Sequence, residues 1–253
     1  MPSGSPTRYT HGSMSQTHGP TTLILGALEE EIAAFLELLR ARVDQAWNGF
    51  RFHCGTLQGS EVVVSRSGVG KSLSAAVTQH LIDRYSPARL LLTGLAGAIA
   101  PQLEVGDTLV ARDCLQYDLD ATALGFKLGE IPYTPYRILE SDPALLTAAL
   151  GYRPRRGRLH SGRILTGDRF LVSAGAQRYG YLRSELLGDA VEMEGASVAL
   201  VARLNGVPFL IVRTISDCAD GKPGGNLRAI LADVSRNSLA CVQHVLAAVG
   251  AAA

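Results

Sequence analysis

The chain has 253 residues, 47% of them hydrophobic, which is enough for one large domain with a full core and unlike a disordered chain. A formal net charge of +1 gives no indication of a nucleic-acid or membrane-surface partner, and no apolar run approaches the ~20 residues that span a bilayer. The cysteines (Cys54, Cys114, Cys218 and Cys241) lack C-x-x-C spacing, which favours reduced thiols in a cytoplasmic protein over a zinc site or a disulfide framework.

Residues 1–20 form a polar leader rich in Ser, Gly, Pro and Thr, without the apolar core of a signal peptide. Gly12 and Ser13, directly before Met14, are typical of a cloning scar, which would make Met14 the natural start. We therefore expect a disordered leader over residues 1–20, native or tag-derived, and a single domain over residues 21–253.

Apolar runs that suit strands alternate with segments of helical spacing through the rest of the chain. Thr21–Ala27 is typical of a buried strand and is predicted to end at Gly26. The next segment predicts one helix reaching Val43, because its apolar residues follow a helical spacing: Ile32, Phe35, Leu36, Leu39 and Val43. The acids Glu29–Glu31 in its first turn would be stabilised by the helix dipole, or one of them points into a cleft.

Two strands, Phe50–Leu57 and Glu61–Ser67, are predicted to form a hairpin around Gln58 and Gly59, and a helix follows through Tyr85. Further strands are expected over residues 88–93, 107–117 and 159–166, near Ala190 and from Pro208. Further helices are expected over residues 143–150, 174–186, 197–204 and 227–248. This alternation, without an internal repeat or a linker, indicates a single three-layer α/β domain.

Charged side chains follow two of the buried strands. Glu192–Glu194 come after one short apolar strand, and Arg213–Asp217 end the apolar run that begins at Val207. Open α/β sheets bind ligands at the carboxyl ends of their strands, so both segments are candidates for one site. Solvated strand ends or charges at a helix N-terminus explain the same acids about equally well.

The turn Ser67–Ser72 nearly matches the phosphate-binding P-loop pattern. Ser65 stands where the first glycine should be, however, and no later strand ends in an obvious magnesium-binding aspartate, so a tight strand-to-helix turn is favoured. The small residues of Gly94–Ala98 indicate that the backbone approaches a ligand or another strand closely. The loop over residues 118–135 carries apolar side chains that suit a covered pocket or a subunit contact, namely Leu124, Phe126 and Pro132.

Six motifs, in this order, resemble the purine nucleoside phosphorylase superfamily and, within it, the bacterial methylthioadenosine/S-adenosylhomocysteine nucleosidases. They are Gly26–Glu31 (GALEEE), Ser67–Lys71 (SGVGK), Thr93–Gly97 (TGLAG), Thr166–Phe170 (TGDRF), Val191–Glu194 (VEME) and Arg213–Asp217 (RTISD). Each motif alone would be weak, but the series extends from about Leu23 to the C-terminal helix. The resemblance implies a three-layer α/β/α sandwich with a central mixed, twisted sheet. It also removes the P-loop interpretation, because the family's S-G-[IV]-G-K turn binds no nucleotide phosphate.

The resemblance implies hydrolysis of an adenine–ribose bond without a metal or organic cofactor. Asp217 matches the general acid near N7 of the base, and Glu31 the acid that activates the attacking water, with Arg213 beside it. Phe170 matches the residue that stacks on adenine, and Glu194 the one that holds the ribose hydroxyls. The other residues that the resemblance assigns to the substrate pocket are Leu28, Leu95, Ala96, Gly97, Leu171, Glu192, Met193, Ser216 and Leu227. Leu124, Phe126 and Pro132 match a segment that closes the partner subunit's 5′-substituent pocket, which implies a homodimer.

These residue types suit the chemistry. Adenine leaves poorly unless it is protonated, and its departure passes through an oxocarbenium-like state, so an acid is needed on the base side and a carboxylate on the water side. Asp217 would have to hold a proton near neutral pH, whereas Glu31 would have to be ionised. Anionic carboxylates also favour the positive charge that grows on the sugar.

A hydrolase is favoured over a phosphate-dependent phosphorylase. The phosphorylases bind phosphate with an arginine in the first strand–helix loop, where this chain has Glu29–Glu31, and with an Arg-x-x-Ser pattern that is absent from Leu92–Leu95. A carboxylate at that position would repel phosphate. Leu95 departs from the Ser or Thr of many nucleosidases, which leaves rate and substrate preference open.

Other functions remain as alternatives. Within the hydrolases, VEMEGASV and the run LGEIP (residues 128–132) also resemble enzymes that cleave 6-amino-6-deoxyfutalosine in menaquinone synthesis. A purine-nucleoside binding protein without catalysis would not need both Glu31 and Asp217, and a P-loop nucleotidase would need magnesium.

Overall fold

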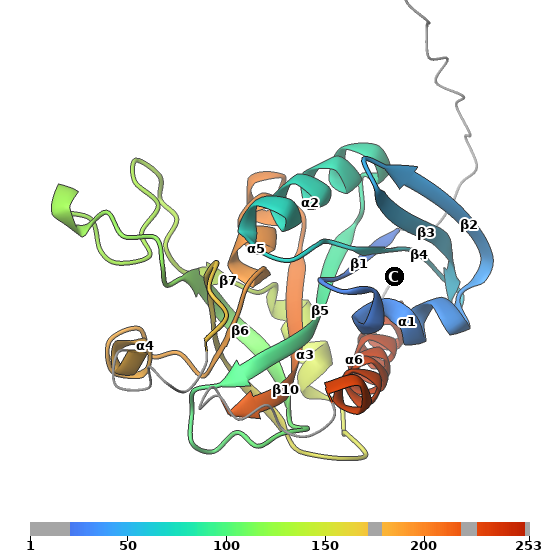
Figure 1. Ribbon diagram of the computed structural model, residues 1–253. Coiled ribbons are helices and arrows are strands. Elements are labelled where there is room, and N and C mark those ends of the chain that lie inside the picture. Colours follow the sequence, from blue (N-terminus) through green and yellow to red (C-terminus); the bar gives the residue numbers. More distant parts are fainter. Residues whose placement is uncertain (1–20, 172–178, 219–226, 251–253) are drawn as a thin grey trace, which may run out of the picture.

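The computed structural model describes residues 21–171, 179–218 and 227–250, and it forms one mixed α/β domain (Figure 1). The strands are β1 (Thr22–Gly26), β2 (Arg40–Trp47), β3 (Phe50–Leu57), β4 (Ser60–Arg66), β5 (Arg89–Ala98), β6 (Thr108–Gln116), β7 (Leu139–Glu140), β8 (Leu159–Thr166), β9 (Ala190–Glu192) and β10 (Phe209–Cys218). The helices are α1 (Glu29–Leu38), α2 (Lys71–Tyr85), the 3₁₀ turn η1 (Thr122–Leu124), α3 (Pro143–Leu150), α4 (Gly180–Ser184), α5 (Gly195–Leu204) and α6 (Leu227–Gly250). The expected leader lies outside the described residues.

All the strands belong to one mixed sheet in the order β10-β6-β8-β9-β5-β1-β4-β3-β2, with β7 on β6. The strands β1, β4, β5 and β10 are parallel, whereas β6 pairs antiparallel with β10, and β9 antiparallel with β5. An additional parallel pairing between β10 and β5 closes β10, β6, β8, β9 and β5 into a ring. The mixed sheet confirms the expectation drawn from the sequence.

Helices cover both faces of the sheet. On one face α1, α3 and α6 pack over Ile24, Leu91 and Val212. On the other, α2 and α5 pack over Leu25, Leu92 and similar residues. Neighbouring residues of one strand thus belong to opposite cores, which is why these strands are apolar throughout rather than alternating. The predicted three-layer sandwich is confirmed. No helix in the described ranges is long and apolar enough to cross a membrane.

The helix predicted to reach Val43 is wrong in its second half. The helix α1 ends at Leu38, Leu39 turns to an extended conformation, and β2 runs antiparallel to β3 from Arg40. Leu39 is buried but Val43 is 57% exposed, so the apolar spacing joined two residues that do not share a face. Pairing with β3 overrides the helical preference of this segment, because tertiary contacts outweigh local propensity.

Most other elements follow the expectations. The β3–β4 hairpin turns at Gln58 and Gly59, which have φ of 52° and 82°, the conformation of a type I′ turn. The helix α3 and the strand β8 have the predicted bounds. The strand β5 continues through the small residues to Ala98, so its end and that of β10 run side by side beyond the end of β1. This shared end of β5 and β10 carries the candidate site.

Candidate active site

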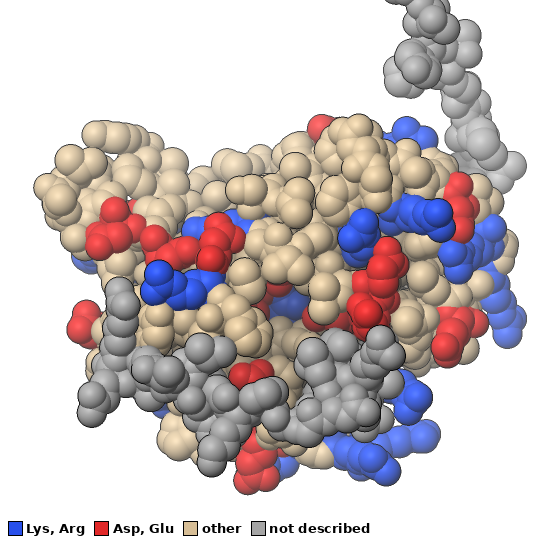
Figure 2. Space-filling view, viewed as in Figure 1, with Lys and Arg blue, Asp and Glu red and all other residues tan. Residues whose placement is uncertain are grey.

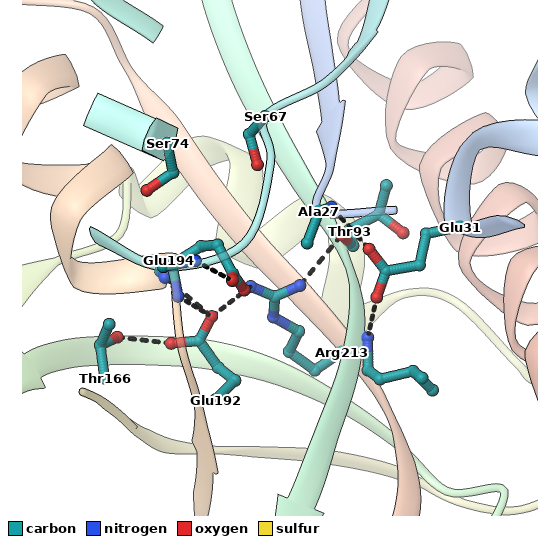
Figure 3. A network of polar contacts seen from close by, with 12 residues as sticks. Ala27, Glu31, Ser67, Ser74, Thr93, Thr166, Glu192, Glu194 and Arg213 are labelled. Atoms are coloured by element: carbon teal, nitrogen blue, oxygen red, sulfur yellow. Dashed lines mark hydrogen bonds and ion pairs between the residues drawn. The ribbon is translucent and has the colours of Figure 1, made fainter. Parts of the chain in front are cut away.

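Glu31 lies in the first turn of α1, and its carboxylate turns back across the end of β1 (Figure 3). Its Oε2 accepts hydrogen bonds from the backbone amides of Ala27 at 2.5 Å and Leu28 at 3.0 Å, and its Oε1 accepts one from Leu95 at 2.9 Å. The side chain is only 3% exposed. Burial raises the pKa of the Glu31 carboxyl, although Arg213 and the three amides act in the opposite direction. Both interpretations of the acids at residues 29–31 apply to Glu31, because its carboxylate accepts the Leu28 amide at the helix start, as in a capping box, and also reaches Leu95 of β5.

Arg213 is fully buried in β10 and organises the acids around it (Figure 3). Its Nη1 donates to the carbonyl oxygen of Thr93 at 3.0 Å, and its Nη2 forms an ion pair with Glu192. The same Nη2 lies 3.5 Å from Glu194 Oε2. A buried guanidinium needs such partners, because an unpaired charge in the interior is strongly destabilising. The network explains why charged residues end this apolar strand.

Both carboxylate oxygens of Glu192 already have partners within the protein. Its Oε1 accepts a hydrogen bond from Thr166 Oγ1 at 2.5 Å, and its Oε2 accepts bonds from the amides of Glu194 at 3.0 Å and Gly195 at 2.7 Å, besides the pair with Arg213. These contacts hold together the ends of β8 and β9, the middle of β10 and the start of α5. Glu192 therefore supports the site, and its predicted contact with substrate stays a prediction.

Glu194, at the N-terminal end of α5, is buried beside Arg213. Its Oε1 accepts a hydrogen bond at 2.9 Å from the amide of Gly70, in the turn before α2. Burial, followed by the charge of Glu192, raises the pKa of Glu194 to about 7, against the influence of Arg213 and the Gly70 amide. This carboxyl therefore titrates near neutral pH.

Gly94 allows Glu31 and Arg213 to lie against β5. Its φ is +147°, and a Cβ there would lie 2.5 Å from Glu31 Oε1 and would also overlap Arg213 Nη1. Only glycine leaves room for both charged groups at this position. The close approach predicted from the small residues of Gly94–Ala98 is thus an approach of β5 to two charged side chains.

Asp217 lies a short distance along the same strand pair. It is opposite Gly97 of β5, whereas the Glu31 carboxylate is bound to the amide of Leu95, two residues earlier, a rise of about 7 Å along a strand. Asp217 is partly exposed, and its Oδ1 accepts a hydrogen bond from Ser216 Oγ at 2.5 Å. Asp217 and the Glu31 carboxylate are thus both next to the Leu95–Gly97 stretch of β5, and their action on one nucleoside stays a prediction. In the space-filling view of Figure 2, the surface is hollowed near its middle, and acidic and basic side chains lie at the floor of the hollow.

The other predicted pocket residues lie around this strand end or on loops beside it. Leu28, Leu95, Gly97 and Met193 are partly buried, and Ala96 is buried with its carbonyl oxygen accepting from Ser216 Oγ at 3.4 Å. Phe170 is 74% exposed and Leu171 is buried, after the end of β8. Leu227 begins α6, but its side chain lies outside the described part of the chain.

The loop over residues 118–135 projects from the body of the domain, at the upper left of Figure 1. Leu124 is 70% exposed on η1, Phe126 and Pro132 are partly buried, and the Phe126 ring packs edge-on against Tyr133 at 5.4 Å. The structure thus places these three residues on a projecting loop, and their contact with a partner subunit stays a prediction.

Several residues of the network were not found from the sequence. Thr166 and Gly70 supply hydrogen bonds to Glu192 and Glu194, and Thr93 receives one from Arg213. All three stand within the six motifs, so motif membership was the available signal. Within the described ranges, no group of His, Cys, Asp and Glu side chains could hold a metal ion.

Comparisons with known proteins agree with this site. Residues 21–249 match the Phosphorylase superfamily. A 5′-methylthioadenosine/S-adenosylhomocysteine nucleosidase from Staphylococcus haemolyticus is 33% identical over 223 residues, covering 88% of this chain and 97% of that protein. The crystal structure of such a nucleosidase from Colwellia psychrerythraea, in complex with adenine, has a TM-score of 0.82 and 32% identity, covering 90% of this chain and 95% of that one. A futalosine hydrolase from Helicobacter pylori also has a TM-score of 0.82 and 32% identity, with 90% and 97% covered. The chain therefore belongs to the Phosphorylase superfamily and, within it, to the 5′-methylthioadenosine/S-adenosylhomocysteine nucleosidases.

Proposed function

We propose that the protein is an N-glycosyl hydrolase that cleaves 5′-methylthioadenosine and S-adenosylhomocysteine, releasing adenine and the 5-thioribose product. The position of Glu31 is the observation that carries hydrolysis rather than phosphorolysis. Its carboxylate accepts hydrogen bonds from the backbone amides of Ala27, Leu28 and Leu95. A bound anion at this strand end would need the same donors. A phosphate would have to displace a buried carboxylate and lie beside two more, Glu192 and Glu194. Water meets no such repulsion.

The mechanism follows from the two ends of the site. Asp217 protonates the leaving adenine, and Glu31 takes a proton from water on the opposite side of the sugar, as paired carboxyls do in inverting glycosidases. Glu194 holds the ribose hydroxyls, and Phe170 stacks on the base. The negative charge shared by Glu31, Glu192 and Glu194, only partly balanced by Arg213, favours the cationic transition state. Burial raises the pKa of Glu31, and a raised pKa makes its carboxylate a stronger base towards water.

The partner subunit is part of this proposal. The projecting loop that carries Leu124, Phe126 and Pro132 supports a homodimer in which each subunit closes the other's 5′-substituent pocket. Sedimentation of the purified protein as a monomer at micromolar concentration would contradict it. Placement in the cytoplasm rests on the scattered cysteines and stays a prediction.

The test is release of free adenine from 5′-methylthioadenosine, with and without added phosphate. Adenine released at the same rate without phosphate is the expected result, and strict dependence on phosphate would make the protein a phosphorylase.

A futalosine-type substrate is the second candidate, supported by the similarity to the Helicobacter pylori futalosine hydrolase. Parallel assays with S-adenosylhomocysteine, 6-amino-6-deoxyfutalosine and inosine rank the substrates. A higher kcat/KM for aminodeoxyfutalosine than for methylthioadenosine would make the futalosine-type compound the preferred substrate.

A further inference from the structure

Lys71 ends the turn that resembled a P-loop, and the proposed chemistry gives it no role. It is the first residue of α2, and its ammonium group points to the end of β6. Lys71 Nζ lies 2.6 Å from Asp118 Oδ1 and donates to Gln116 Oε1 at 3.2 Å. The pair lies at the protein surface, with 19% of the Lys71 side chain and 27% of the Asp118 side chain exposed. Its two hydrogen bonds hold the lysine at a specific position beside the end of β6.

Asp168 closes this pair into a ring of three residues. Its backbone amide donates to Asp118 Oδ2 at 2.8 Å, and its Oδ1 accepts from the backbone amide of Lys71 at 2.8 Å. Both oxygens of Asp118 are thus used, one by the ammonium group and one by the amide. Charge-assisted hydrogen bonds of this kind are stronger and more directional than neutral ones.

The ring lies between the parts of the site that bind base and sugar. Asp168 is two residues before Phe170, whose side chain is largely exposed and so is positioned by its backbone rather than by packing. On the other side, the amide of Gly70 holds Glu194, and the carbonyl oxygen of Lys71 accepts from Ser197 Oγ at 2.7 Å. Two adjacent residues, Gly70 and Lys71, therefore connect the ribose carboxylate to the loop that carries Phe170.

We propose that Lys71 and Asp118 are positioning residues for the purine part of the site. They fix the loop at Asp168–Leu171 at a set distance from Glu194, so that a base stacked on Phe170 and a ribose bound by Glu194 fit one nucleoside. The inference rests on the proposed function, in which Phe170 contacts adenine. Asp118 also begins the projecting loop of residues 118–135, so the same ring connects the purine loop to the segment that faces the partner subunit.

The test compares the full-length protein with Lys71→Met, Asp118→Asn and the double variant. Asparagine has one acceptor oxygen, so it can satisfy either Lys71 Nζ or the Asp168 amide but not both. Each single variant is expected to bind adenine about tenfold more weakly, the effect of one lost hydrogen bond to a charged group, and to raise KM for methylthioadenosine similarly. The kcat is expected to change less. The double variant should bind adenine no more weakly than the weaker-binding single variant does, because both substitutions break the same ring of hydrogen bonds.

Two controls separate positioning from a general loss of structure. Binding of 5-methylthioribose, the sugar product, is expected to stay unchanged in all three variants, because Glu194 keeps its own contacts. Arg42→Met breaks the ion pair between Arg42 and Asp44 on β2, which is more exposed, and is expected to leave adenine and sugar binding unchanged. Thermal unfolding confirms that each variant is folded.

Unchanged adenine affinity in both single variants overturns the inference, and so does an equal loss of adenine and methylthioribose binding. Affinities are measured by calorimetry, which needs no turnover. A wild-type protein that binds adenine and does not cleave methylthioadenosine would therefore contradict the proposed function alone. A wild-type protein that does not bind adenine would contradict both.

Discussion

Replacing Gly94 by alanine should reduce catalysis far more than folding. The added methyl group would lie 2.5 Å from Glu31 Oε1 and would overlap Arg213 Nη1. Ordinary contacts are about 3.5 Å, so both groups must retreat by about 1 Å. A displacement of about 1 Å in a catalytic group can lower the rate about 100-fold. The φ of +147° adds about 1–3 kcal/mol of backbone strain in the folded protein.

The assay measures kcat and KM for methylthioadenosine together with thermal unfolding. Gly106→Ala is the matched control, because Gly106 also has a positive φ, +93°, but a Cβ there would meet nothing within 4 Å. Both variants should have a lower Tm, and only Gly94→Ala should lose about 100-fold in kcat. If Gly94→Ala keeps the wild-type kcat while its Tm falls as in the control, the position of Glu31 and Arg213 does not govern the reaction.

Four further predictions concern the carboxyls. Asp217→Asn should lower kcat at least about 100-fold in a folded protein, and a wild-type rate would remove its role as general acid. Glu194 should give kcat/KM a rise with pH centred near 7, and Glu194→Gln should weaken ribosyl ligands and remove this part of the rise, which leaves the part that the base Glu31 contributes. Because folded Glu194 binds its proton more tightly than the unfolded chain does, urea denaturation should show its contribution to stability falling from pH 4.5 to about 7, with a flatter profile in Glu194→Gln. Glu192→Gln removes a charge that raises the pKa of Glu194, so the rise in kcat/KM should move to lower pH; an unmoved profile would contradict this coupling.

Local patterns predicted much of the fold. The hairpin at Gln58 and Gly59 was recognisable because few residues adopt a positive φ in a two-residue turn. The helix α3 has the bounds expected from the sequence, and the structure shows Pro143 in its first turn and Asp142 capping the amides of Ala144 and Leu145. The strand β2 was not, because Leu39 and Val43 fit a helical spacing by chance and only pairing with β3 decides the conformation.

The sequence predicted individual residues of the candidate site, but not the hydrogen bonds and ion pairs that connect them. The motifs named Glu31, Glu194 and Arg213, yet nothing local shows that Glu192 binds an arginine 21 residues later in the chain. Lys71 and Asp118 are 47 residues apart in the chain. In the sequence Lys71 nearly matched a phosphate-binding pattern, and its ion pair with Asp118 was not predicted. Such long-range partners are set by the order of strands in the sheet, which the periodicity of one segment does not encode.

The additional pairing between β5 and β10 gives each of these strands neighbours on both sides over part of its length, and Arg213 lies in that part of β10. In the described sheet the long free edge belongs to β2, at the opposite end of the strand order. Edge strands fray first, and strands inside a sheet open only with the whole domain. Amide protons of β5 and β10 should therefore be the slowest to exchange with solvent. Local opening of β2 leaves the chemistry undisturbed.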